Sequence, residues 1–582
     1  MKKIMLIVFV FIASIVKAQV SVNWFNYPNG VSVSTDSLNN VYTAYWDYNP
    51  AGDITLTKRN VAGTILWDAA YNNTDNTKHE MATWVATDHA GNILVSGTIR
   101  SGFSNPVNAA SVLMKFSPTG TLLWRVVYES AFDGSSTTKC LVDANNNIYV
   151  LGIGTGPNGQ VTKVKKFNPS GVSVWNYFDA GIGAPITFKF TPDHKILIVH
   201  RSITGILNGY SKIDLNGNNV WSLGGISSTT VGDAAGDAFG NTYIVNGSPS
   251  QLKKLSPTGT LIWSQPNNNM NGSKVEVGTD HKPVVAGYPM SGFGVVMKKY
   301  DSSGTFLWQN LDADGPGLSL LALTPMRLDS CNAAYIAGGT MSLMGVCKVN
   351  SNGASEWAIT TSSGYPTWFD FGTDNRVFVT GGTTASIINN APCQSISLNL
   401  FIQGYYQSAG TMNPVLFNQG VTTNLNVTDS IQVELRSAVV PYTLVAQTKA
   451  ILNVNGTVSC HFTAASGLYY IVIRHRNGVQ TWSASPINVG PGAVFYNFTS
   501  AANKAYGSNQ VQVSTGIWAI YSGDITQDGV IDGLDYNEWE NDNNNFAGGY
   551  FSTDLNGDGI VDGLDFIFWE ENSNNFVGAV VP

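Results

Sequence analysis

Charged side chains are scarce in this 582-residue sequence. Asp, Glu, Lys and Arg make up only 12% of it, and the formal net charge is -8. A chain with so few cations and an acidic balance offers no basic patch for nucleic acid or for an anionic lipid surface. We therefore expect no nucleic-acid partner. The length exceeds what one ordinary hydrophobic core needs, so several domains are expected.

Cysteine is also rare. Five cysteines in a chain of this size do not make a disulfide framework, and an odd number leaves at least one without a partner in the chain. Cys393 and Cys460 could bracket one small domain.

Long apolar runs are missing after the N-terminus. The run from Ile4 to Val16 follows two lysines and precedes the small residue Ala18. It is shorter than the ~20 residues that a membrane-spanning helix needs. This arrangement is typical of a secretory signal peptide, residues 1–18, cleaved after Ala18. We expect a secreted or cell-surface protein without a membrane span.

Helical periodicity is absent from the first two thirds of the chain, where a repeat takes its place. Each copy, about 42 to 57 residues long, joins an Asp-turn-strand to a Lys-strand and a Trp-strand. Four short β runs separated by Gly, Asn, Pro or Ser turns are typical of a four-stranded propeller blade. The copies pair Asp88 with Trp124, Asp143 with Trp175, Asp237 with Trp263 and Asp280 with Trp308, and more weakly Asp36 with Trp67, Asp193 with Trp221 and Asp329 with Trp357.

The two ends of the array complete each other. The segment VSVNWFN with Trp24 is a Trp-strand without earlier strands, whereas the last copy, around Asp374, has early strands and no Trp. An N-terminal strand that closes the last blade removes an exposed edge. Seven full units and this shared one predict eight blades over residues 19–392, with seven as the alternative. The repeated Trp and the apolar Tyr-Val strand are expected to fill the contacts between blades.

These units resemble the secreted β-propeller repeats of the form D-x-x-G-N-x-Y-V-x-G…K-x-x-x-x-G-x-x-x-W that are common in exported proteins of Bacteroidota. The resemblance implies the fold, but propellers host binding, scaffolding and catalysis alike. The repeated aspartates are interpreted as turn residues that bind their own backbone. His89, His194 and His281 are interpreted in the same way. No nucleophile motif or acid pair stands out, so no catalytic residue is assigned.

After Cys393 the repeat stops and strands with a period of two follow. They predict a β-sandwich of the immunoglobulin-like kind over residues 393–500. A linker is expected over residues 501–521. The sandwich resembles the small module that precedes C-terminal tails in secreted proteins of Bacteroidota, and we expect it to act as a spacer.

Two acidic loops, DITQDGVIDGLD and DLNGDGIVDGLD, carry the strongest chemical pattern in the sequence. Calcium needs six or seven oxygen ligands, which a short loop delivers from positions 1, 3, 5, 7, 9 and 12 around a glycine at position 6. Gly529 and Gly559 hold position 6. We expect two structural calcium ions with these ligands, the residues at positions 7 acting through their carbonyl oxygens: Asp524, Thr526, Asp528, Val530, Asp532 and Asp535; Asp554, Asn556, Asp558, Ile560, Asp562 and Asp565.

The tandem loops, each ending in Asp rather than Glu, resemble the type I dockerin module over residues 522–582. The resemblance implies a small α domain in which each loop is followed by a helix, with Trp539 and Trp569 at equivalent places. Thr526 departs from the Asn or Asp of that family at position 3 and predicts a weaker first site. Gly533-Leu534 and Gly563-Leu564 replace its polar recognition pair, which leaves a cohesin-like partner doubtful.

The sequence therefore predicts an exported, non-catalytic binding or scaffold protein. Its propeller is the recognition platform for a glycan or protein ligand, and its calcium-folded tail docks to a protein partner. The alternative is a polysaccharide-active enzyme, a glycoside hydrolase or lyase, tethered through the tail. A third hypothesis makes the tail a sorting or assembly handle.

Overall fold

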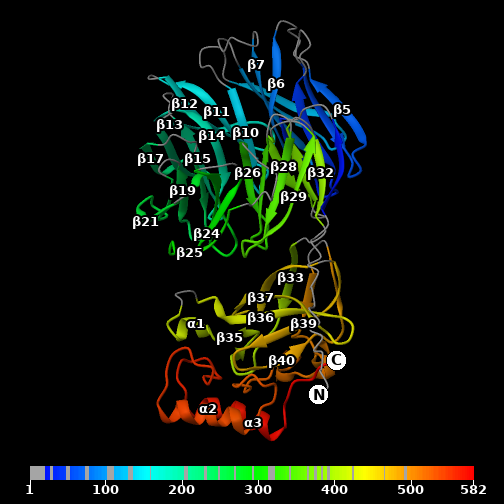
Figure 1. Cartoon of the computed structure of the whole chain (residues 1–582), viewed down its shortest axis with the longest axis vertical. Coiled ribbons are helices and arrows are strands. Elements are labelled where there is room, and N and C mark those ends of the chain that lie inside the picture. The colour runs from blue at the N-terminus through cyan, green and yellow to red at the C-terminus, as the bar shows by residue number, and fades with distance from the viewer. Residues whose placement is uncertain are drawn as a thin grey trace, which may run out of the picture. The chain divides into compact units, whose positions relative to one another are not determined.

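A computed structural model describes residues 20–582 (Figure 1), apart from the following: 27–30, 47–52, 72–77, 101–109, 129–135, 157–158, 202–206, 228–231, 247–249, 268–269, 291–293, 312–321, 340–342, 363–365, 373–375, 382–383, 390–392, 422–424, 465 and 491–493. The chain divides into two compact units, Met1–Asn390 (unit 1) and Ala391–Pro582 (unit 2). The expected signal peptide and Asp374 lie outside the described residues. No helix in the described part is long and apolar enough to cross a membrane.

Unit 1 is a β-propeller of eight four-stranded antiparallel sheets, as the repeat predicted. Figure 1 shows them in chain order, from blue at β5 to green at β28. Blades 1 to 4 consist of β2 (Ser32–Thr35), β3 (Val41–Trp46), β4 (Ile54–Arg59) and β5 (Ile65–Tyr71); β6 (His79–Thr87), β7 (Ile93–Arg100), β8 (Ala110–Phe116) and β9 (Leu122–Tyr128); β10 (Ser136–Val142), β11 (Ile148–Gly156), β12 (Gly159–Phe167) and β13 (Ser173–Ile182); β14 (Ala184–Phe190), β15 (Lys195–Arg201), β16 (Leu207–Asp214) and β17 (Asn219–Ser227).

The remaining blades continue in the same order. Blades 5 to 8 consist of β18 (Asp233–Gly236), β19 (Thr242–Asn246), β20 (Gln251–Leu255) and β21 (Leu261–Pro266); β22 (Met270–Val277), β23 (Pro283–Pro289), β24 (Val296–Tyr300) and β25 (Phe306–Asn310); β26 (Ala322–Leu328), β27 (Ala334–Gly339), β28 (Leu343–Val349) and β29 (Ser355–Ser362); β30 (Trp368–Phe371), β31 (Arg376–Thr380), β32 (Thr384–Asn389) and β1 (Val20–Asn26).

The N-terminal strand closes the ring. β1 pairs antiparallel with β32 as the outer strand of blade 8, as expected from the two incomplete ends of the repeat. At the inner edge, β30 lies against β2 of blade 1, and the backbone N–H of Thr35 donates to Asp370 Oδ2. Every blade therefore has a neighbour on both sides.

Consecutive blades are joined by the repeated Trp and Lys. In blade 1, Trp67 Nε1 and Lys58 Nζ both donate to the carbonyl oxygen of Pro118, which lies in the β8–β9 turn of blade 2. The same pair of donors recurs with Trp124 and Lys115 on Pro169, Trp175 and Lys166 on Leu215, and Trp263 and Lys254 on Ser302. The expectation that the Trp fills contacts between blades is confirmed.

A glycine of each turn lies on the face of that Trp. Gly217 has φ +85°, and a Cβ there would lie 2.8 Å from Trp175 Cδ2. The position therefore combines a left-handed backbone with a close aromatic contact, and only glycine meets both conditions without strain.

Gly217→Ala is expected to destabilise unit 1 more than Gly225→Ala. Gly225 lies in the same blade with φ +74°, but no atom lies within 4 Å of its added Cβ. Both variants cost about 1–2 kcal/mol for the left-handed backbone, and Gly217→Ala costs a further ~1–3 kcal/mol because Trp175 must move. Unfolding midpoints of the two variants in denaturant measure the difference. Equal midpoints would contradict a role of this glycine in blade packing.

The turn interpretation of the repeated aspartates is confirmed in five blades. Asp88 Oδ1, for example, accepts from the backbone N–H groups of Ala90 and Asn92. The corresponding residues are Asp36, Asp143, Asp237 and Asp329. In blades 4 and 6 the aspartates hold another position of the turn than in the other blades, although Asp280 Oδ1 still accepts from the backbone N–H of Lys282. Thr191 and Gly278 begin those turns, and Asp193 and Asp280 come two residues later, where they bind Lys212 at 2.9 Å and Lys299 at 2.8 Å.

The histidines of these turns are turn residues, but they are not equivalent. His194 and His281 have φ 55° and 57° and close their turns in the left-handed position, which Gly91 occupies in blade 2. His89 comes directly after Asp88 instead, and its backbone N–H donates to Asn146 of the next blade.

Unit 2 contains these elements: β33 (Cys393–Asn399), β34 (Tyr406–Ser408), β35 (Thr411–Met412), α1 (Val415–Asn418), β36 (Val427–Ser437), β37 (Leu444–Asn453), β38 (Thr457–Thr463), β39 (Gly467–His475), β40 (Gly478–Trp482), β41 (Ile487–Val489), β42 (Val494–Asn497), η1 (Ala502–Lys504), η2 (Tyr506–Ser508), β43 (Val511–Ser514), β44 (Ile517–Ala519), α2 (Gly533–Asn544) and α3 (Gly563–Asn574). Hydrogen bonds link eight of the strands in the order β40-β39-β36-β37-β38-β33-β42, with β41 on β39. The expected sandwich is thus one continuous sheet.

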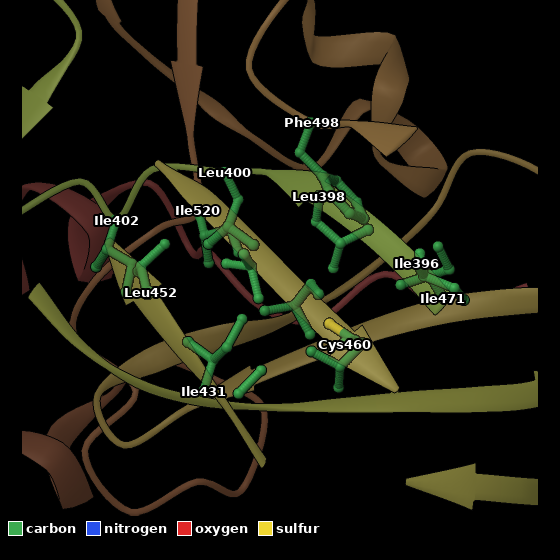
Figure 2. Close-up of a cluster of buried hydrophobic side chains, with 14 of the residues drawn as sticks. Ile396, Leu398, Leu400, Ile402, Ile431, Leu452, Cys460, Ile471, Phe498 and Ile520 are labelled. Atoms are coloured by element: carbon green, nitrogen blue, oxygen red, sulfur yellow. The ribbon is translucent and has the colours of Figure 1, made fainter. Parts of the chain in front are cut away.

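Buried apolar side chains of the sheet form a core in unit 2 (Figure 2). Strands from both ends of the sheet contribute to it, among them β33 with Ile396 and Leu398 and β39 with Ile471. Residues 501–521, expected as a linker, instead form two 3-10 turns and the hairpin β43–β44. Ile520, directly after that hairpin, lies in the same core.

The suggested bracket between Cys393 and Cys460 is wrong. Cys460 is a buried free thiol, whereas Cys393 is disulfide-bonded. The reason is register: on the paired strands β33 and β38, Cys460 faces Ile396 and Cys393 faces Thr463, three positions apart.

Candidate functional site

The inner strands of the blades surround a cavity of about 980 Å³ in unit 1. Along each inner strand, side chains alternate between the cavity and the packing between blades, as the period of two requires. On β10, for example, Lys139 and Leu141 line the cavity, and Cys140 between them also belongs to a buried apolar cluster. The cavity is the central channel of the propeller.

Charged residues concentrate in this channel although the whole chain is poor in charge. Lys189 Nζ lies 2.9 Å from Asp233 Oδ2 and 2.8 Å from Glu276 Oε1. Arg327 lies 2.6 Å from Asp370. Each of these carboxylates is bound by a cation, which favours its ionised form, but burial outweighs Lys189 at Glu276 and raises the pKa of that carboxyl group.

Two lysines of the channel, Lys139 and Lys274, form no ion pair with carboxylates in the described part of the chain. Burial, reinforced by the charges of Lys189 and Arg327, lowers the pKa of Lys139 to about 7. Burial also lowers the pKa of Lys274. The channel therefore holds two amines that an incoming anion would stabilise in the charged form.

Lys139 lies between two indole rings. Its Nζ is 4.3 Å from the ring centre of Trp368 and 5.0 Å from that of Trp84. The two rings meet edge to face, with centroids 4.7 Å apart. These residues come from blades 2, 3 and 8, so the cluster is assembled across the channel. Both Trp side chains are partly exposed to the cavity.

The sequence reasoning did not find this site. A usable signal existed, because the cavity-lining residues lie four and two positions before the turn residue that follows each inner strand. Counting back from Asp143 gives Lys139 and Leu141, and from Asp88 gives Trp84 and Ala86. The alternation was visible in each copy, but which of the two faces lined the channel was not.

The C-terminal loops lie in unit 2, each followed by a 12-residue helix, α2 or α3. Gly529 and Gly559 adopt φ 95° and 94°, the left-handed turn expected at position 6. Asp524, Asp535, Asp554 and Asp565 are buried, while Asp528 and Asp558 are exposed. The other predicted residues have intermediate exposure (Asp532, Asn556 and Asp562) or are exposed (Thr526, Val530 and Ile560).

The two loops are arranged as copies of each other. Trp539 Nε1 donates to the carbonyl of Asp562, and Trp569 Nε1 donates to that of Asp532. The backbone bridges are reciprocal in the same way: Val530 pairs with Gly578, and Ile560 with Gly548. The two tryptophans thus hold equivalent places, as predicted.

The buried aspartates have local backbone partners. Asp565 Oδ1 accepts from the N–H groups of Leu555 and Asn556, and its Oδ2 accepts from that of Asp562. Asp562 in turn is the N-cap of α3, so that it forms a capping box with Asp565. Asp532 and Asp535 do the same for α2. Sequence reasoning missed this second role, although the D-x-x-D spacing before a helix signals it.

Several features of the loops suit a cation. Asp524 Oδ1 is buried and has no hydrogen-bond partner among the described residues. Burial, together with the charges of Asp535 and Asp528, raises the pKa of Asp524 to about 6. Burial is also the main cause that raises the pKa of Asp565 to about 7, with Asp554 adding to it. However, within the described residues no three carboxylates of either loop bring oxygens within 4.8 Å of one another.

These raised pKa values predict how the stability of unit 2 depends on pH without calcium. A carboxyl group whose folded pKa exceeds its unfolded value holds more protons when folded, so stability falls as pH rises through that window. In a chelating buffer, the unfolding midpoint of unit 2 should therefore decrease from about pH 4 to about pH 7. Saturating calcium should remove this decrease. Thermal scans of the whole chain test it, and a midpoint that rises over this range without calcium would contradict it.

The acidic loops are bound into the rest of unit 2. Asn477 Nδ2 donates to the carbonyl of Asp554 at 3.2 Å, and Asn418 Nδ2 donates to that of Gly557 at 3.0 Å. Asn572 of α3 donates to Gln403 Oε1 and to the carbonyl of Ser522. The loops and helices thus share a compact unit with the preceding strands.

Known proteins resemble this chain only in fold. No family model and no curated protein matches the sequence. The Dos1 propeller matches 64% of this chain and 95% of its own, with 10% identity and a TM-score of 0.43. The C-terminal WD40 domain of Sif2 matches 63% of this chain and 98% of its own, with 12% identity and a TM-score of 0.44. A protein of unknown function from Bacteroides caccae covers 55% of this chain and 93% of its own at 12% identity and a TM-score of 0.30. The class that the fold defines is a β-propeller protein.

Proposed function

We propose that this protein is an exported, non-catalytic binding protein whose propeller channel receives the ligand. The observation that carries the proposal is the cluster of Lys139, Trp84 and Trp368 beside a cavity of about 980 Å³. A concave site with aromatic walls and a few converging polar groups is the usual form of a ligand site. Export rests on the signal-peptide pattern of residues 1–18.

Binding is favoured over hydrolysis because of the ion pairs in the channel. Polysaccharide hydrolysis needs one carboxyl group that keeps its proton and a second that is free to attack or to activate water. Lys189 binds both Asp233 and Glu276, and Arg327 binds Asp370. These cations hold the nearest carboxylates in ion pairs.

A glycan and protein array probed with the full chain tests this function. The glycans retained on the array are then examined for new reducing ends. Retention without cleavage supports a binding protein. Cleavage of a retained glycan would establish the alternative, a polysaccharide-active enzyme. Failure to retain any glycan or protein would contradict a recognition role of the propeller.

In unit 2, the tandem loops are proposed to hold two structural calcium ions. Asp524 Oδ1 of the first loop is buried without a hydrogen-bond partner among the described residues, and Asp565 of the second loop is also buried. The residues at positions 9 and 12 also cap the helices, so a bound ion would stabilise both the loop and the first turn of the helix that follows it. Calorimetric titration of the calcium-free chain should give two bound ions, and no uptake would contradict the site.

The tail is further proposed to dock to a protein partner, in keeping with its dockerin-like pattern. The same apolar side chains are exposed in both copies: Leu534 and Leu564 at 56% each, and Phe546 and Phe576 at 92% and 91%. Because the loops form hydrogen bonds with the rest of unit 2, deleting residues 523–582 would disturb the fold of that unit as well as remove the proposed docking surface. Leu534→Ser with Leu564→Ser is the better test, and unchanged localisation and unchanged partner capture would contradict docking through these residues.

A further inference from the structure

The channel also carries information about the chemistry of its ligand. We propose that it binds an acidic sugar, whose carboxylate pairs with Lys139 and whose ring packs on Trp84 and Trp368. This inference rests on the proposed binding function and names the class of ligand. Three independent features of the channel point to the three parts of such a molecule.

The first feature is an amine without a carboxylate partner. Lys139 is 7% exposed and lies beside the two indole rings, while Lys189 and Arg327 are already paired, Lys189 with Asp233 and Glu276 and Arg327 with Asp370. A buried amine that lacks an anion in a cavity is suited to receive one from a ligand, since a charge-assisted hydrogen bond there is strong.

The second feature is the pair of indole rings. Trp84 on β6 and Trp368 on β30 present aromatic surface beside the amine. An aromatic face binds the C–H face of a ring while the polar groups of that ring remain free for hydrogen bonds. The ring and the carboxylate of the ligand are therefore expected to be joined directly, as in a hexuronic acid.

The third feature is an acceptor. Asp233 lines the same cavity, and its buried Oδ1 has no hydrogen-bond partner among the described residues. An unpaired buried carboxylate oxygen is costly, and a ligand hydroxyl would satisfy it. Ser34, Thr87 and Thr367 also line the channel, and their hydroxyl oxygens, which are already hydrogen-bonded within the propeller, keep a lone pair for a ligand hydroxyl. A fatty acid or an aromatic acid has no hydroxyls for these groups, which favours a sugar.

The electrostatics of the channel agree with this ligand. Burial is the main cause that lowers the pKa of Lys139 to about 7, and the charges of Lys189 on β14 and Arg327 on β26 lower it further. The carboxylates of Glu276 on β22 and Asp233 on β18 act in the opposite direction. An added carboxylate favours the ammonium form. Binding above neutral pH should therefore take up a proton, which calorimetry in buffers of different ionisation heat measures.

The test uses the full chain and three probes: a trimer of galacturonic acid, a neutral trimer of galactose, and benzoate. We expect the acidic trimer to bind and to quench tryptophan fluorescence, with the other two at least about tenfold weaker. Galacturonic acid monomer is added to distinguish a free sugar acid from a chain end. Equal binding of the acidic and neutral trimers, or preferred binding of benzoate, would overturn the inference.

Two variants locate the site. Lys139→Met keeps the volume of the side chain and removes its charge, and we expect binding of the acidic trimer to weaken about 30-fold or more. Lys253→Met, on β20 outside the channel lining, is the matched control and should leave binding unchanged. Unchanged binding in Lys139→Met, with an unchanged melting transition, would also overturn the inference.

Failure of this inference is distinguishable from failure of the proposed function. If the chain retains another glycan or a protein on the array but not the acidic trimer, the ligand class is wrong and the binding function stands. If nothing is retained, both are wrong.

Discussion

Asp429→Asn is expected to cause the largest loss of stability in unit 2. Asp429 is fully buried, and its carboxylate accepts hydrogen bonds from Arg476 Nε at 2.9 Å, His475 Nε2 at 3.1 Å and the Tyr550 hydroxyl at 2.7 Å. Removing one member of a buried charge pair leaves the other uncompensated, which costs about 3–5 kcal/mol. The unfolding midpoint of unit 2 in denaturant measures the loss.

A milder change to the same network provides the control. Tyr550→Phe removes one hydrogen bond to Asp429 and leaves Arg476 paired. The expected cost is only about 1 kcal/mol, up to ~3 kcal/mol for a bond to a charged group. Equal midpoints for the two variants, or a midpoint of Asp429→Asn equal to that of the native chain, would contradict the role of Asp429.

The carboxylate of Asp429 also predicts that unit 2 loses stability in acid. Burial would raise the pKa of Asp429, but the hydrogen bond and charge of His475 and the charge of Arg476 outweigh burial and hold it well below the usual range. A lowered folded pKa stabilises the fold above the unfolded pKa of about 3.9, and this contribution is lost as pH falls further. This pH range lies below the one in which the titration of Asp524 and Asp565 changes the stability of unit 2.

The second large effect concerns calcium. Asp554→Asn with Asp565→Asn is expected to abolish one of two binding sites and the stabilisation that goes with it. Each site adds about 2.7 kcal/mol at a calcium concentration a hundredfold above its Kd. Calcium titration by calorimetry should fall from two ions to one. The melting transition of unit 2 should respond less to calcium, while that of the propeller stays unchanged.

The matched control removes the same charge outside the loop. Glu570→Gln with Glu571→Gln changes two exposed carboxylates of α3. We expect this variant to bind two ions. If the loop variant bound two ions, or the control variant only one, calcium binding would depend on the overall negative charge of the tail and not on the ligands of the loop.

The sequence predicted the blades well because each blade repeats one local pattern. The Asp turn, the Lys-strand and the Trp-strand are all fixed by nearby residues, so eight units and the closing strand β1 could be counted. Where the turn lacks its Asp, as at Thr191 and Gly278, the next aspartate was mistaken for it. The geometry of the turn, and not the residue type, therefore defines which residue of each blade begins the turn.

Contacts between distant residues could not be predicted in the same way. Lys139, Trp84 and Trp368 come from three different blades, and no local spacing relates them. Asn477 and Asp554 likewise meet across unit 2, which turned an expected linker and tail into parts of one compact unit. In both cases the residues meet because the fold brings distant segments together, and a local sequence pattern does not encode such a contact.

The most direct test of the division of roles between the units is ligand binding before and after calcium is removed. The full chain is titrated with the ligand that the array identifies, first in calcium and then in a chelating buffer. We expect the affinity to stay the same while the melting transition of unit 2 falls, because the channel is built from the inner strands of the propeller alone. Loss of ligand binding on chelation would contradict a recognition site in the propeller.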